Sequence, residues 1–156
     1  MQLEITREKQ AITDLDWYCT DDAGHVGYFL TEAQELPPSV KAATAELTLT
    51  ARYLWEKLKY VSDFRVDPKL ALEIPDRRDR DERYLRNFTP LASKGIFLYD
   101  SAEYPQTHYF RVAIPTRPLH LYDLPDNIAK IIARTKLRGS LLRTMTRLEY
   151  EESLTL

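Results

Sequence analysis

The strongest constraint on the fold of this chain is a pair of alternating apolar and polar runs on either side of one short turn. The runs cover residues 15–20 and 25–31, and the residues 21–24, Asp-Asp-Ala-Gly, separate them. Alternation with a period of two is typical of strands in a half-buried sheet. The sequence therefore predicts a β-hairpin in which Gly24 takes a positive φ at the turn.

The alternation also assigns a face to each side chain of the first strand. Leu15, Trp17 and Cys19 fall on one face, and Asp16 and Tyr18 fall on the other. Because the first set is apolar, we expect it to face the core and the second set to face outward.

A stripe of apolar residues predicts one long helix after the hairpin. Its members recur every three or four residues: Val40, Ala43, Leu47, Ala51, Leu54, Leu58 and Val61. This spacing corresponds to a helix of about six turns, with Trp55 widening the buried stripe. Ser39, which follows two prolines, is a suitable N-cap.

Shorter elements are expected in the second half of the chain. The charged residues 76–83 could open a second helical region that runs to Leu91, and strands are expected at Ile96–Tyr99 and Thr107–Ile114. Leu119–Tyr122 is a candidate edge strand. The pattern leaves open whether residues 62–93 and 141–156 form regular structure.

A third helix is indicated by helical spacing from Ile128 to Leu137. Asp123 or Asp126 would be its N-cap, and Gly139 would end it. Strands near the ends of the chain with helices between them indicate an α+β fold. We expect an antiparallel sheet, made of the hairpin and strands near residues 95–122, packed against one long and one or two shorter helices in a single domain of residues 1–156.

Charge is distributed unevenly along the chain. The net charge is −2, with 8 Lys and Arg against 13 Asp and Glu in residues 1–75 (−5) and 14 against 11 in residues 76–156 (+3). The small total argues against general attraction to nucleic acid or anionic lipid. The N-terminus has no apolar core of signal-peptide length, and no run approaches the roughly 20 apolar residues of a membrane span. A cytoplasmic protein without membrane contact is expected.

Reactive side chains form no recognisable catalytic or metal-binding motif. His25, His108 and His120 lack the close helical spacing of metal-ligating pairs, and a single cysteine excludes a cysteine cluster. Cys19 and His25 could face each other across the hairpin, but nothing indicates a lowered thiol pKa. The acidic group around the turn (Asp14, Asp16, Asp21 and Asp22) is better explained by turn chemistry than by acid–base catalysis or cation binding. No catalytic residue, metal or cofactor is expected, although a small enzyme of unknown reaction stays an alternative.

Two features could serve binding. One is a stretch with six bases and no acid between residues 127 and 148: Lys130, Arg134, Lys136, Arg138, Arg143 and Arg147. It could contact phosphates of a nucleic acid, but a solvated helix face explains it better. The other is the high tyrosine content, including Tyr18, Tyr99, Tyr104, Tyr109 and Tyr122. Tyrosine suits protein interfaces and sheets packed under helices equally well.

Several segments resemble a group of small bacterial proteins, many of them uncharacterised and some regarded as candidate immunity proteins of polymorphic toxin systems. The similar segments are Asp16-Trp17-Tyr18, Asp21 to Phe29, Lys94 to Asp100, Tyr109 to Pro115, Pro118-Leu119 and Asp123-Leu124-Pro125. They cover about two-thirds of the chain in scattered pieces, at the level of short motifs. Residues 60–90 and the C-terminal tail depart from the pattern.

The resemblance implies a stable scaffold that binds and neutralises a toxin domain without catalytic residues. Complementary charge would speed association, and aromatic anchors would hold the complex. The acidic N-terminal half would suit a basic toxin. The residues expected to contact the partner are Asp16, Tyr18, Asp21, Asp22, Asp76, Asp79, Asp81 and Glu82. The oligomeric state is not predicted.

Overall fold

The computed structural model describes residues 15–31, 36, 40, 44–102, 108–142, 147–149 and 154–155. Its strands are β1 (Leu15–Thr20), β2 (Val26–Thr31), β3 (Phe64–Val66), β4 (Phe97–Ser101), β5 (His108–Pro115), β6 (Lys136–Leu137), β7 (Arg147–Glu149) and β8 (Leu154–Thr155). Its α-helices are α3 (Thr44–Arg52), α4 (Leu70–Glu73), α5 (Glu82–Leu85), α6 (Thr89–Ala92) and α7 (Asp126–Ala133). A π-helical turn η1 (Tyr53–Lys57) and two 3-10 turns, η2 (Arg77–Arg80) and η3 (Leu121–Asp123), complete the described elements. The predicted α+β class is confirmed.

The described strands form one eight-stranded sheet with the order β3-β5-β4-β2-β1-β6-β8, and β7 pairs with β5. The hairpin is confirmed, since β1 and β2 pair antiparallel from Leu15↔Thr31 to Thr20↔Val26. Gly24 takes φ 80° in its turn. The prediction of an antiparallel sheet is wrong, because β2–β4 and β1–β6 are parallel pairs. The long segment between β2 and β4 is a crossover connection, which allows the parallel pairing.

The predicted long helix is shorter than expected. Helix α3 ends at Arg52 and passes into η1, after which Leu58 is extended (φ −65°, ψ 126°). Leu54 and Leu58 are buried as the stripe predicts, but Val61 lies beyond the helix and is 72% exposed. The predicted N-cap, Ser39, lies outside the described residues.

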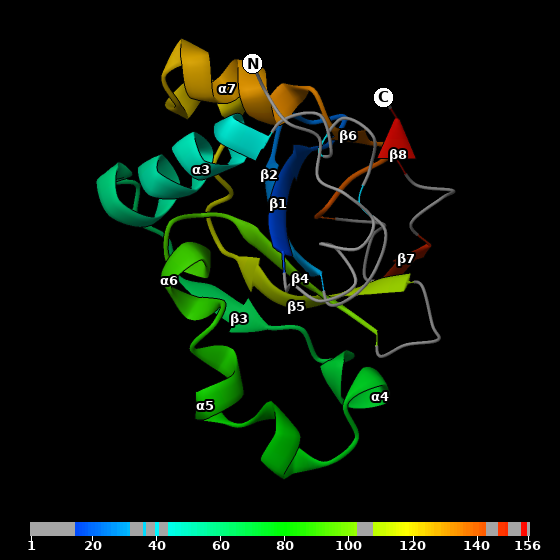
Figure 1. The fold of residues 1–156 in the computed structure, drawn as a ribbon. Helices are drawn as coiled ribbons and strands as arrows, with labels where there is room; N and C mark the ends of the chain where they lie inside the picture. Colours follow the sequence, from blue (N-terminus) through cyan, green and yellow to red (C-terminus); the bar gives the residue numbers. More distant parts are fainter. Residues whose placement is uncertain are drawn as a thin grey trace.

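The second helical region is divided into η2, α5 and α6 because its acids cap separate turns. Asp76 accepts a hydrogen bond from Arg78 N, and Asp81 accepts one from Tyr84 N, each at the N-cap of a new element. The elements α4, η2 and α5 form a lobe below the sheet in Figure 1.

Two further predictions for the C-terminal half are wrong in detail. The candidate edge strand at Leu119–Tyr122 is a single β-bridge from His120 to His25, followed by η3. Helix α7 has Pro125 at its N-cap, with Asp126 in the first turn and Asp123 in η3. The helix ends at Ala133, well before Gly139, because the chain returns to the sheet as β6.

Both faces of the central sheet are buried. Helices α3, α6 and α7 lie along one face (Figure 1), where Tyr18, Val26 and Tyr28 belong to the first hydrophobic cluster. Trp17 and Phe29 belong to a second cluster on the opposite face. A sheet covered on both faces requires apolar or aromatic side chains in both directions.

The second face also holds buried polar groups. Trp17 Nε1 donates to Thr31 Oγ1 at 2.9 Å, and Thr31 Oγ1 lies 2.7 Å from the Tyr109 hydroxyl. Arg111 Nε donates to Asp67 Oδ2 at 2.9 Å, with both side chains buried. Each of these polar groups has a partner, so its burial is compensated.

Candidate functional site

The two carboxylates of the hairpin turn bind backbone amides. The expectation that Asp21 is exposed is wrong, because it is 2% exposed. Its Oδ1 accepts hydrogen bonds from Ala23 N and His25 N, each at 2.9 Å, and its Oδ2 accepts one from Leu141 N at 2.8 Å. Asp21 therefore shapes the turn and fixes it to a segment 120 residues further along the chain.

Asp22 is exposed and binds the same distant segment. Its Oδ2 accepts a hydrogen bond from Gly139 N at 2.7 Å, and Lys136 Nζ lies 3.4 Å from its Oδ1. The Gly139 N–H and then Lys136 lower the pKa of Asp22. Both turn carboxylates thus connect the N-terminal hairpin to the chain after β6.

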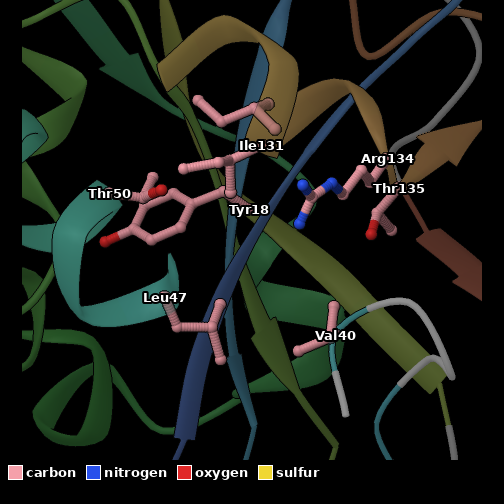
Figure 2. A pocket seen from close by; sticks show the side chains of 8 residues that line it. Tyr18, Val40, Leu47, Thr50, Ile131, Arg134 and Thr135 are labelled. Carbon is pink, nitrogen blue, oxygen red and sulfur yellow. The ribbon is translucent and has the colours of Figure 1, made fainter. Parts of the chain in front are cut away.

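Tyr18 is buried at 4% exposure, so the prediction of an outward-facing ring is wrong. Its side chain lies between β1 and the helices α3 and α7 (Figure 2), and its hydroxyl accepts a hydrogen bond from Trp55 Nε1 at 3.1 Å. Burial, followed by the nearby Asp16 carboxylate, raises the pKa of Tyr18. The hydroxyl is therefore neutral and acts as a hydrogen-bonding group.

A row of carboxylates and tyrosines crosses three neighbouring strands next to Tyr18. We call Asp16, Tyr28, Asp100 and Tyr84 the Tyr–Asp row. The registers Asp16↔Leu30 and Leu30↔Asp100 place the two carboxylates at the same level of β1 and β4, with β2 between them. Tyr84 in α5 donates from its hydroxyl to Asp100 Oδ2 at 2.7 Å.

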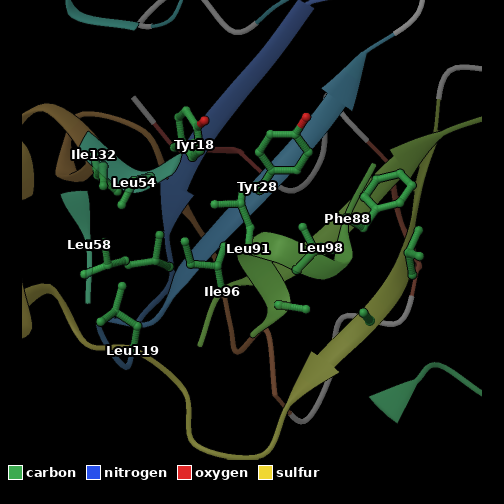
Figure 3. Close-up of a cluster of buried hydrophobic side chains, with 14 of the residues drawn as sticks. Tyr18, Tyr28, Leu54, Leu58, Phe88, Leu91, Ile96, Leu98, Leu119 and Ile132 are labelled. Carbon is green, nitrogen blue, oxygen red and sulfur yellow. The ribbon is translucent and has the colours of Figure 1, made fainter. Parts of the chain in front are cut away.

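Tyr28 lies in β2, between the two strands that carry the carboxylates of the row. Its ring centroid is 5.5 Å from that of Tyr18, and Figure 3 shows both rings on the hairpin strands. Burial raises the pKa of Tyr28, and Asp16 and Asp100 raise it further. Asp16 is half-buried, whereas Asp100 is buried. The row therefore combines acidic groups with aromatic rings at the margin of the first cluster.

The four predicted acids of the lobe are all exposed: Asp76, Asp79, Asp81 and Glu82. Asp76 Oδ2 accepts a hydrogen bond from Arg78 Nη2 at 2.9 Å, and Arg78 lowers the pKa of Asp76. Asp81 and Glu82 begin α5, the helix that carries Tyr84. Asp16 lies at the same level of the sheet as Asp100, which accepts a hydrogen bond from Tyr84 of α5, whereas Asp21 and Asp22 lie at the opposite, turn end of β1.

The histidines do not come together as a metal site. His108 Nε2 lies 3.0 Å from Glu73 Oε2, and His25 Nδ1 lies 3.5 Å from Asp21 Oδ2. The His120 ring stacks on Tyr122 with centroids 4.3 Å apart. Within the described residues, no group of three or more His, Cys, Asp and Glu side chains could hold a metal ion.

Cys19 is fully buried, and burial raises the pKa of its thiol well above the ordinary value. A protonated, enclosed thiol is a poor nucleophile. This arrangement agrees with the prediction that Cys19 is a small core residue.

The basic stretch is partly neutralised by acids from elsewhere in the chain. Arg134 Nη1 donates to Glu46 Oε2, and Lys136 lies beside Asp22. Lys130 in α7 and Arg138 after β6 are exposed. The two remaining candidates toward the C-terminus, whose side chains lie outside the described part of the chain, are Arg143 and Arg147.

The predicted tyrosines divide between core and surface. Tyr18, Tyr99 and Tyr109 are buried, and Tyr122 is 92% exposed. Tyr104 lies outside the described residues. Tyr18, Tyr99 and Tyr109, for which the sequence left an interface and sheet packing equally open, are therefore part of the sheet packing.

No protein-family model, curated protein or solved structure matches this chain. The resemblance to immunity proteins therefore stays a prediction from short motifs. In the part of the chain that the structure describes, no helix is long and apolar enough to cross a membrane.

Sequence reasoning missed Tyr28, Tyr84, Asp100 and Trp55 as neighbours of the predicted residues. The hairpin register alone pairs Tyr28 with Tyr18 and could have identified it. Asp100 and Tyr84 lie near Asp16 and Tyr28 only because β2 pairs with β4 in parallel and because α5 is positioned beside Asp100. No local pattern in the sequence carries that information.

Proposed function

We propose that this chain is a non-enzymatic protein-binding module that neutralises a bacterial toxin domain in the cytoplasm. The observation that carries the proposal is the Tyr–Asp row at the margin of the first cluster. Asp16, Tyr84 and the adjoining Trp55 are half-buried there, so part of each side chain can contact a partner. Tyrosine and tryptophan are enriched among the residues that dominate protein interfaces.

The chemistry of the row suits a basic partner. Asp16 and Asp100 supply negative charge on either side of Tyr28, and the exposed Asp81 and Glu82 lie at the start of the adjoining helix. A lysine or arginine from the partner could pair with the half-buried Asp16 and pack against an aromatic ring. Complementary charge of this kind speeds association and selects the partner.

The alternatives have less support among the described residues. An organic substrate would not fit the cavity beside Tyr18, which has a volume of about 20 Å³. Nucleic-acid binding by the basic stretch is disfavoured because Arg134 and Lys136 already have acidic neighbours. Neither alternative has a specific arrangement of side chains in its favour.

The test is co-expression with the product of the adjacent upstream gene in a bacterial host. We expect that product to be toxic alone and harmless when the wild-type chain is present. Asp16→Lys should abolish this protection, because it reverses the charge that faces the partner. The matched control is Asp63→Lys, an exposed carboxylate just before β3, four strands from β1 in the sheet order.

Circular dichroism and urea unfolding of both variants establish that they fold. A toxic product that the wild-type chain does not relieve, or a product with no toxicity, would exclude the immunity function. Equal protection by wild type and a folded Asp16→Lys variant would instead exclude the Tyr–Asp row as the docking surface.

A further inference from the structure

A small cavity lies between α3, α7 and β1, beside the Tyr18 ring. Its volume is about 20 Å³, and its apolar wall is formed by Val40, Leu47, Ile131 and Ile132. A cavity of this size has room for about one water molecule. The size of the cavity therefore matches a water molecule.

One polar atom inside this region has no partner. Thr50 in α3 is 1% exposed and lines the cavity, and its Oγ1 makes no hydrogen bond within the described residues. A threonine within a helix often donates to the carbonyl four residues earlier, but Thr50 does not. Burying a hydroxyl without a partner costs free energy, so its hydrogen bonds are expected to be completed by another group.

Tyr18 supplies a second polar group beside the same space. Figure 2 shows Thr50 near the hydroxyl end of the Tyr18 ring, and both residues line the cavity. The Tyr18 oxygen accepts from Trp55 Nε1 at 3.1 Å, which leaves the hydrogen of its own hydroxyl for an acceptor. Thr50 and Tyr18 therefore each offer one O–H donor, and their hydroxyl oxygens can also accept hydrogen bonds.

Arg134 lines the cavity on the side away from the Tyr18 hydroxyl (Figure 2). Its guanidinium also donates to Glu46 Oε2, an ion pair that joins the end of α7 to α3. The guanidinium is therefore engaged at the end of the cavity away from the Tyr18 hydroxyl. Thr50 and Tyr18 give a water molecule two polar neighbours, which lies within the usual range of two to four hydrogen bonds.

We propose that this cavity is a binding site for one ordered water molecule, which joins Thr50 Oγ1 in α3 to the Tyr18 hydroxyl in β1. The water accepts a hydrogen bond from Tyr18 and exchanges one with Thr50. It completes a polar connection from Trp55 through Tyr18 to α3, and it fills a space that apolar side chains leave open. The structure thereby couples the position of α3 to that of β1.

The experiment compares wild type with Thr50→Val and Thr50→Ser. Valine has the shape of threonine but no hydroxyl, whereas serine keeps the hydroxyl and is the matched control. The measurement is water–protein magnetisation transfer by NMR at the Thr50 and Tyr18 amides, together with the urea midpoint. We expect a long-lived water signal in wild type and Thr50→Ser and its loss in Thr50→Val, with an unchanged or lower urea midpoint.

Two results would overturn the proposal. One is the absence of a long-lived water signal in folded wild-type protein. The other is a higher urea midpoint for Thr50→Val than for wild type, because removal of an unpaired hydroxyl from a dry cavity stabilises the fold. Tyr18→Phe gives a second measurement that does not alter α3, and it should also weaken the water signal.

Discussion

Replacement of Asp21 by alanine should destabilise the protein far more than the same change at Asp22. Asp21 accepts three backbone hydrogen bonds, from Ala23 N, His25 N and Leu141 N, at 2.8 to 2.9 Å. The bond from Leu141 is buried, so its loss leaves an amide without a partner, at a cost of about 1–3 kcal/mol. The two turn bonds are partly buried and contribute about 1 kcal/mol each, because water can replace part of them.

These contributions give an expected loss of about 4 kcal/mol for Asp21→Ala. For a chain of this length, that loss corresponds to a decrease in Tm of about 8–16 °C. The assay is urea unfolding followed by circular dichroism and tryptophan fluorescence, with an unchanged m-value as evidence that only the folded state is affected. Thermal unfolding gives the change in Tm independently.

Asp22→Ala is the matched control, since Asp22 is exposed and binds the same distant segment. Its urea midpoint should stay close to that of wild type. Asp21→Asn should lose less stability than Asp21→Ala, because its amide oxygen can still accept from Ala23 N and His25 N, whereas its amide nitrogen cannot accept the hydrogen bond from Leu141 N. A loss below about 1 kcal/mol for Asp21→Ala would refute the assignment of Asp21 as a buried connection between hairpin and C-terminal segment.

Two further predictions concern the same hairpin. Gly24→Ala should destabilise the fold by about 1–3 kcal/mol from its positive φ alone, with an added clash because a Cβ would lie 2.3 Å from His120 Nε2. His120→Ala should relieve the clash, so an equal urea-midpoint penalty in both backgrounds would contradict the contact. Cys19 should react with a thiol reagent only after unfolding, because it is fully buried and the pKa of its thiol is raised; rapid modification of folded protein would contradict this burial.

The proposed docking surface and the hairpin connection give different responses to mutation. Asp16 is half-buried and is hydrogen-bonded to Tyr28, so a change there should affect binding and should destabilise the fold less than a change at Asp21. Asp21 is enclosed by backbone amides, so a change there should affect folding first. The two aspartates are five positions apart in sequence yet have different roles. Asp16 lies at the margin of the core, whereas Asp21 lies in the hairpin turn and is covered by the segment that contains Leu141.

Several features of the fold could be predicted from local sequence. The hairpin, its register and Gly24 follow from alternation and turn chemistry, which depend on neighbouring residues alone. Strands β4 and β5 follow in the same way from residues 97–101 and 108–115. Local sequence does not predict which strands pair with β4 and β5 or in which direction, since strand order depends on contacts between distant segments.

The exposure of the candidate site could not be predicted from the same patterns. Tyr18 alternates with apolar residues and was expected to face outward, but α3, η1 and α7 cover that face and bury it. A period of two assigns side chains to opposite faces, and it does not say whether one face or both are covered. The predicted acids of the lobe are exposed, as charged residues between short turns usually are.

The sequence by itself therefore determined local elements: the hairpin with its turn and the strands β4 and β5. Only the tertiary structure decided that both sheet faces are buried, that Asp21 reaches Leu141, and that Asp16, Tyr28 and Asp100 form one row. The reason is physical. The alternation of side chains and the hydrogen bonds of a turn depend on residues that are close in sequence. Burial and the pairing of polar groups depend instead on which distant segments pack together.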